Sequence, residues 1–197
     1  MKSLSDCLTK TTLATLMSAI VLSAALSSQV KAQEISGVEV AEQIVINDSQ
    51  LQLNGAGVRS KFFFDLYVGS LYLTAPSADL ASVISSDESA VRLNITSGMI
   101  TSDKMRDAII DGFDDATDGN TTDIQAQIDA FMALFSDEIK EGDQFTLLTS
   151  KVSGVTAYKN GVPQDTIEGE AFRQALLKIW LGDSPAQTSL KKDMLGE

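Results

Sequence analysis

The sequence contains no histidine, and its single cysteine, Cys7, lies within the first 32 residues. The rest of the chain therefore offers no zinc site built from His or Cys and no Ser–His or Cys–His nucleophile. A disulfide framework is excluded as well. We accordingly assign no catalytic residue, no metal ligand and no cofactor from the sequence.

Long apolar runs are also scarce. The one candidate, Thr12–Leu26, is too short to span a bilayer comfortably. It follows a cationic start and precedes Val30–Ala32, which places small residues at the two positions that a signal peptidase reads. We predict a signal peptide over 1–32, one domain over 33–197, and a periplasmic or secreted location. An uncleaved N-terminal anchor is the alternative.

Basic residues are few. Removing residues 1–32 takes three lysines and one aspartate from the 15 basic and 27 acidic residues, leaving a net charge of −14. This charge argues against nucleic acid or anionic lipid as a partner, and we expect no stable membrane insertion once the signal is removed. An acidic ligand would need a local cation.

The densest aromatic segment of the chain is Leu53–Leu73, reading LNGAGVRSKFFFDLYVGSLYL. If it is extended, its side chains alternate between two faces. One face would be core: Val58, Phe62, Phe64, Leu66, Val68 and Tyr72. The other would carry Arg59, Lys61, Phe63, Asp65 and Tyr67. A cation and a phenol over an apolar floor suit a small, acidic, apolar ligand, whereas an ordinary edge strand with a solvated face is the alternative.

Gly55 and Gly57, just before Arg59, predict a bulge or a close backbone approach. Eight residues of straight strand span roughly 26 Å, so Arg59 and Tyr67 can meet only if the chain folds or bulges between them, near Ser60. Lys61 or Tyr72 could substitute for Tyr67.

The remaining pattern predicts an α+β fold in which helices cover one face of a large antiparallel sheet. Residues 34–47 indicate two short strands or a strand and its turn, and later strands are expected at 90–96, 144–149 and 151–159. Asn160-Gly161 is a strong hairpin signal. Helices are expected from Pro76 to Ser86, from Thr101 or Ser102 to about 113, over 124–139 with an end at Gly142, over Glu170–Leu181, and from Pro185 to 195.

The sequence contains neither a calcium-binding EF-hand loop nor a glycine-rich phosphate-binding motif, although two segments resemble them. The acidic loop Asp114–Gly119 would need an oxygen ligand at its third position and an acid at its twelfth to be a calcium loop, but Ala116 and Gln125 occupy these places. Gly55-Ala56-Gly57 leads into a strand rather than a helix, so it is not a phosphate-binding fingerprint.

The order of these motifs resembles the chalcone isomerase superfamily, and most closely its exported bacterial chalcone isomerase-like branch. The resemblance rests on G-A-G-V-R within Leu53–Leu73, on Glu88–Ser97, on the hairpin at Asn160-Gly161, and on the I-W-L-G-x-x-P-A piece within Ala175–Gly196. It implies a large antiparallel sheet with helices on one face and a ligand cleft between them.

The superfamily includes cofactor-independent plant isomerases and plastid proteins that bind fatty acids. In both, the arginine after the G-x-G piece faces the ligand, which implies this role for Arg59. Tyr67 stands where the fatty-acid binders also have tyrosine. The tyrosine and asparagine of the enzymes align with Met105 and Gly112, and a polar enzyme residue aligns near Trp180.

Replacing phenol and amide donors by Met and Gly removes groups that would stabilise an enolate. The resemblance therefore favours a non-catalytic protein that holds a fatty acid or similar apolar carboxylate. Its head group would be bound by Arg59 and Tyr67, and its tail would lie among apolar residues such as Phe63, Met105 and Trp180. The alternatives are a cofactor-independent isomerase of the chalcone–flavanone type and a structural envelope protein whose interior is filled by its own side chains.

Overall fold

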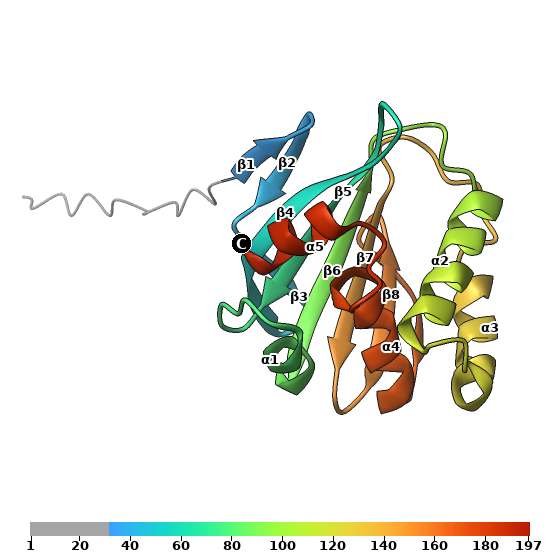
Figure 1. Cartoon of the computed structure of the whole chain (residues 1–197). Helices are drawn as coiled ribbons and strands as arrows, with labels where there is room; N and C mark the ends of the chain where they lie inside the picture. Colours follow the sequence, from blue (N-terminus) through green and yellow to red (C-terminus); the bar gives the residue numbers. More distant parts are fainter. Residues whose placement is uncertain (1–31) are drawn as a thin grey trace, which may run out of the picture.

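A computed structural model of the protein describes residues 32–197 (Figure 1). The predicted signal peptide lies outside the described residues, apart from Ala32, which begins the first strand. In chain order the elements are β1 (Ala32–Ile35), β2 (Val38–Ala41), β3 (Gln43–Ile46), β4 (Ser49–Lys61), β5 (Phe64–Leu73), α1 (Leu80–Ser85), β6 (Glu88–Ile95), α2 (Ser102–Ala116), the 3₁₀ turn η1 (Thr122–Ile124), α3 (Gln125–Ala133), β7 (Gln144–Ser150), β8 (Gly154–Lys159), β9 (Val162–Ile167), α4 (Glu170–Leu181) and α5 (Thr188–Leu195).

Strands β3 to β9 form one seven-stranded antiparallel sheet in simple sequence order, and β1 and β2 form a separate two-stranded ribbon. The predicted turn between β8 and β9 has φ of 52° at Asn160 and 77° at Gly161, as a type I′ hairpin requires. Helices α2, α4 and α5 lie over the same face of the sheet (Figure 1). The predicted α+β class and its single helical layer are confirmed.

Each face of the sheet has its own apolar cluster. The larger cluster joins the helices to inward side chains of β5 to β8, among them Leu71, Val91 and Leu147. The smaller one lies on the opposite face, where Ile44 and Leu51 of β3 and β4 pack with Tyr72. Because the Asn47 side-chain amide, in the turn between β3 and β4, donates a hydrogen bond to the Tyr158 hydroxyl of β8 at 3.0 Å, β3 and the start of β4 must curl across this face.

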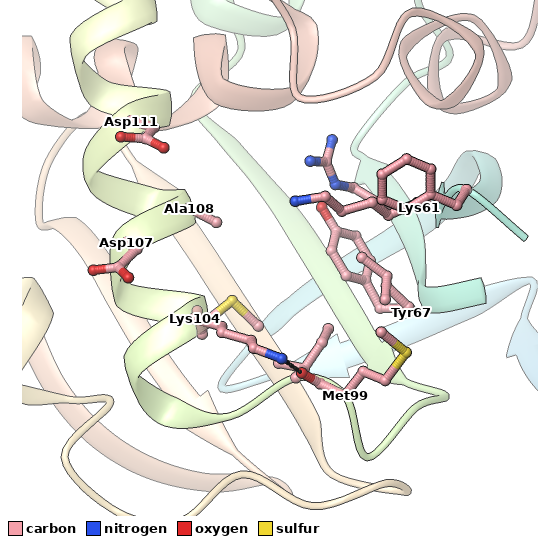
Figure 2. A pocket seen from close by; sticks show the side chains of 12 residues that line it. Lys61, Tyr67, Met99, Lys104, Asp107, Ala108 and Asp111 are labelled. Atoms are coloured by element: carbon pink, nitrogen blue, oxygen red, sulfur yellow. Dashed lines mark hydrogen bonds between the residues drawn. The ribbon is translucent and has the colours of Figure 1, made fainter. Parts of the chain in front are cut away.

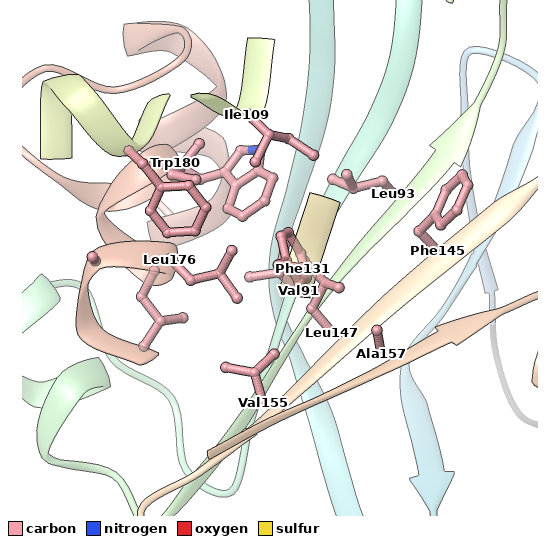
Figure 3. Packing of buried hydrophobic residues seen from close by; sticks show 14 of the residues in the cluster. Val91, Leu93, Ile109, Phe131, Phe145, Leu147, Val155, Ala157, Leu176 and Trp180 are labelled. Atoms are coloured by element: carbon pink, nitrogen blue, oxygen red, sulfur yellow. The ribbon is translucent and has the colours of Figure 1, made fainter. Parts of the chain in front are cut away.

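Aromatic rings fill the space between the helices and the sheet (Figure 3). Phe113 of α2 stacks on Phe172 of α4 with ring centroids 5.3 Å apart, and Phe131 of α3 meets both rings edge-on. In Figure 3, Ile109 and Trp180 lie on the helical side, facing the side chains of the strands. This packing fixes α2 and α4 relative to each other and to the sheet.

The two glycines of β4 let α5 lie directly on the strand. A Cβ on Gly55 would come within 2.0 Å of the Asp193 carbonyl oxygen, and one on Gly57 within 2.3 Å of the Asp193 side chain. The pairing of β4 with β5 also shifts register between Leu53 and Gly55. Both predicted effects of these glycines, a bulge and a close approach, are therefore present.

Several predicted bounds are corrected. The helix expected over 124–139 ends at Ala133, where the backbone changes to tighter i→i+3 bonds from the amides of residues 134–136. The Asp137 and Glu138 carbonyls beyond it accept from Ser102 and Lys159. The buried stripe of that segment is nevertheless as predicted.

The N-terminal region contains three short strands, one more than the pattern indicated. Helix α1 begins at Leu80 rather than Pro76, because the Asp79 side chain caps it by accepting from the Ser82 amide at 2.9 Å. Helix α5 begins at Thr188 rather than Pro185, because residues 186 and 187 bond to the sheet and to α4 instead.

Candidate ligand-binding pocket

Leu53–Leu73, which the alternation of side chains predicts to be one extended strand, is a hairpin. Strand β4 ends at Lys61, β5 begins at Phe64, and the chain reverses at Phe62 and Phe63. Arg59 and Tyr67 are therefore direct partners across the two strands, with a register shift just after Arg59. Directly paired side chains share a face and have Cβ atoms roughly 5 Å apart, so the two residues converge as the ligand hypothesis requires.

The predicted assignment of alternate side chains in Leu53–Leu73 to two faces is correct in part. Val58, Val68 and Tyr72 share one face, and Arg59 and Tyr67 share the other, as predicted. Phe62 and Phe64, which were expected in the core, are exposed because the turn places them at the tip of the hairpin. The second face is also more apolar than predicted, since Leu71 and Leu73 belong to the larger cluster and Leu66, which was expected on the first face, packs against it.

A cavity of about 380 Å³ opens between this hairpin and α2. Lys61 and Tyr67 lie on its sheet side, and Ala108 of α2 faces them (Figure 2). Arg59 of β4 and Met105 of α2 also line it. The rest of the lining consists of Phe62, Leu66, Met99, Ile100, Lys104, Asp107 and Asp111. Its volume lies at the low end of the range for small-molecule pockets, roughly 300–1,000 Å³.

Tyr67 is held in place from behind by α4. The indole Nε1 of Trp180 donates a hydrogen bond to the Tyr67 hydroxyl at 3.0 Å, and both side chains are buried. Burial raises the pKa of Tyr67 above its usual value, an effect that Arg59 and the Trp180 hydrogen bond only partly oppose. The phenol therefore stays protonated at neutral pH. Among the described residues no acceptor receives its proton, so it can donate to a ligand.

Arg59 is fixed by the segment that leads into α5. Its Nη1 donates to the Ala186 carbonyl, and the Gln187 side chain accepts from the Ser60 amide at 3.0 Å while donating to the Val58 carbonyl at 3.2 Å. The four ion pairs among residues 32–197 do not involve Arg59. Its charge is thus not neutralised by a carboxylate contact there.

The charge around the cavity differs in sign from the rest of the chain. Three cations, Arg59, Lys61 and Lys104, line it with two carboxylates, Asp107 and Asp111, whereas the whole chain carries a net charge of −12. This supplies the local cation that an acidic ligand needs. The amino group of Lys104 donates to the Met99 carbonyl at 3.1 Å, as Arg59 Nη1 does to the Ala186 carbonyl. Neither of these cations is paired with a carboxylate among the described residues.

The structure brings some of the predicted site residues together and not others. Arg59, Tyr67 and Met105 line the cavity. Trp180 lies behind Tyr67 and supports it without lining the cavity. Phe63 is 99% exposed at the tip of the hairpin and lies outside the cavity, whereas its neighbour Phe62 is at the mouth. Had the turn at 62–63 been predicted, Phe62 would have been the candidate lining residue, and Phe63 would have been expected at the exposed tip.

Comparison with known proteins bears on the whole described region. A family model described as chalcone isomerase-like matches residues 32–196. The chain belongs to the chalcone isomerase-like family. A search of curated protein sequences finds no significant match.

The fold of this chalcone isomerase-like protein is shared with a solved structure. A fatty-acid binding protein from Arabidopsis thaliana superposes with a TM-score of 0.60 and 14% identity, over 83% of this chain and 94% of that one. This likeness confirms the fold predicted from the resemblance.

Position 112, which the family resemblance aligns with an asparagine of the enzymes, has no room for a side chain. A Cβ on Gly112 would come within 2.8 Å of Ile179 Cγ2, because α2 and α4 pack closely at this point. The other aligned position, Met105, presents a thioether to the cavity where the enzymes have the phenol of a tyrosine. Neither position supplies a hydrogen-bond donor.

Two further observations concern residues 32–197 as a whole. No helix there is long and apolar enough to cross a membrane. No group of three or more carboxylate, imidazole or thiolate side chains in this region is arranged to hold a metal ion.

Proposed function

We propose that this chalcone isomerase-like protein is an exported, non-catalytic binding protein for a fatty acid or a similar small apolar carboxylate. The observation that carries the proposal is the pairing of Arg59 with Tyr67 at the wall of a cavity whose surface is mostly apolar. A guanidinium and a neutral phenol both donate hydrogen bonds, and an ionised carboxylate accepts them strongly.

The arrangement gives each part of such a ligand a distinct environment. The carboxylate would lie between Arg59 and the Tyr67 hydroxyl, with Lys61 adding charge at the mouth. The tail would lie along Leu66, Ile100 and Met105. The likeness to a fatty-acid binding protein supports the same ligand class.

Ligand retention tests this proposal directly. Protein purified after export should carry a bound carboxylate in native mass spectrometry, and Arg59→Ala should lose it. Because a hydrogen bond to a charged group contributes about 1.5–3 kcal/mol, the variant should bind a matched fatty acid roughly tenfold to a hundredfold more weakly. Arg106→Ala is the control, since it removes the same charge from an exposed position on α2 outside the cavity.

Chain length gives a second measurement of the same site. Each methylene that enters the cavity should add about 0.8 kcal/mol to binding, so affinity should rise with chain length and level off once the small cavity is full. Empty protein whose melting temperature no fatty acid changes would refute the proposal.

The isomerase alternative is tested by absorbance. A chalcone incubated with the protein should keep its spectrum, because Met105 and Gly112 provide no donors for a developing enolate. Turnover that Arg59→Ala abolishes would favour the enzyme instead. The structural alternative predicted an interior filled by side chains, and the open cavity of about 380 Å³ does not support it.

A further inference from the structure

The tip of the β4–β5 hairpin exposes three consecutive phenylalanines, at 86% for Phe62, 99% for Phe63 and 54% for Phe64. The other large exposed apolar residues among 32–197 are not consecutive in the chain: Val45, Met99, Ile110, Val152 and Val162. Single exposed apolar residues are ordinary, but a contiguous apolar patch marks an interaction site.

The backbone of the tip is also strained. Phe62 has a φ of 58°, in the left-handed region that bulky residues avoid. A glycine or asparagine would form the same turn without strain. Phe62 is thus unfavourable at this position both because its ring is exposed to solvent and because its backbone is left-handed. It stabilises neither the core nor the turn.

From these observations we propose that the phenylalanine tip, Phe62–Phe64, docks the protein on the surface of a zwitterionic lipid bilayer. The tip is the end of a hairpin, and its side chains are purely apolar. Lys61 and Phe64 form the last backbone pair of the β4–β5 ladder, so only the two turn residues lie beyond the paired backbone. It therefore offers apolar side chains and few backbone groups to a partner, which suits insertion among lipid chains.

The charges at the base of the tip and its small size favour this partner over an anionic surface or a second copy. The base of the tip carries one charge of each sign, Lys61 and Asp65, and the Asp65 carboxylate accepts from the Ser60 and Ser36 hydroxyls at 2.9 Å each. The acidic chain as a whole is repelled by anionic lipid. A stable contact between two copies buries about 800 Å² and some 20–30 residues on each partner, more than a three-residue tip presents.

The tip is continuous with the candidate pocket. Phe62 is at once part of the tip and part of the cavity lining, and Met99, also partly exposed, lies beside the same opening. Docking would therefore place the mouth of the cavity at the lipid surface. The docking proposal stands on the tip itself and goes beyond the proposed binding of a carboxylate.

Sedimentation with phosphatidylcholine vesicles free of fatty acid tests the proposal. The purified exported protein should sediment with them, and Phe62→Ser combined with Phe63→Ser should lower its partition coefficient about tenfold or more, because each phenylalanine loses apolar burial. Val152→Ser is the matched control, since Val152 is 97% exposed on the β7–β8 turn, and it should bind vesicles like the parent. Circular dichroism checks that each variant is folded.

Fluorescence locates the contact. The indole introduced by Phe63→Trp should shift its emission to shorter wavelength on vesicles and be quenched by brominated acyl chains, whereas the buried Trp180 should not respond. Equal vesicle binding by the double serine variant would overturn the proposal. The proposal would also be overturned if the double serine variant bound vesicles like the parent but differed from it in oligomeric state without vesicles. The tip would then be a contact between copies of the chain. Phe63→Ser alone, which lies outside the cavity, should weaken vesicle binding and leave fatty-acid binding measured without vesicles unchanged, so a failure of the tip and a failure of the pocket are distinguishable.

Discussion

The hydrogen bond from Trp180 to Tyr67 makes a prediction about stability as well as binding. Tyr67→Phe removes the hydroxyl but keeps the ring, so the indole N–H, buried among α4 and the sheet, loses its acceptor at 3.0 Å. An unpaired buried donor costs about 1–3 kcal/mol. For a domain of this size each kcal/mol lowers the melting temperature by about 2–4 °C.

A double-mutant cycle isolates this contribution from packing. Trp180→Phe removes the donor and also leaves a small cavity, so its own cost mixes two effects. If the hydrogen bond acts as described, Tyr67→Phe combined with Trp180→Phe should be less destabilising than the sum of the single variants, with a coupling energy of about 1–2 kcal/mol.

Tyr67→Phe and Trp180→Phe should both lower stability, but they should differ in their effect on fatty-acid affinity. Tyr67→Phe should weaken fatty-acid binding about tenfold or more, because the donor to the carboxylate is lost. Trp180→Phe should weaken it less, since the phenol remains beside Arg59. Urea unfolding and calorimetric titration give the two quantities. Additive destabilisation, or equal binding by Tyr67→Phe and the parent, would refute this account of the site.

Two further predictions concern the fold. Gly55→Ala should destabilise the protein by about 1–3 kcal/mol or more, because its Cβ would collide with the Asp193 carbonyl; Gly98→Ala, which meets no atom within 4 Å, is the control in thermal unfolding. The hydrogen bonds from Arg173 lower the pKa of Glu170 from 4.5 to about 2. Because the folded value is the lower one, the stability that this pair contributes is complete above about pH 4.5 and is lost as the pH falls toward 2. Glu170→Gln should flatten that part of the stability–pH curve, and an unchanged curve would contradict the assignment.

The sequence alone determined those features that depend on local chemistry. The alternation of apolar residues, the Asn160-Gly161 turn and the glycine pair before Arg59 each act through neighbours in the chain. They were sufficient for the α+β class, for the placement of α4 over Glu170–Leu181 and for the close approach at β4.

The tertiary structure alone decided where the chain reverses and which side chains meet. No glycine, proline or asparagine marks the turn at Phe62–Phe63, so the aromatic run looked like continuous strand, and only the pairing of β4 with β5 places Arg59 opposite Tyr67. The support of Tyr67 by Trp180 joins residues 113 positions apart, and the segment after α3 is held by donors from β8 and α2. Such contacts leave no periodic signal, because they arise only once distant elements have packed.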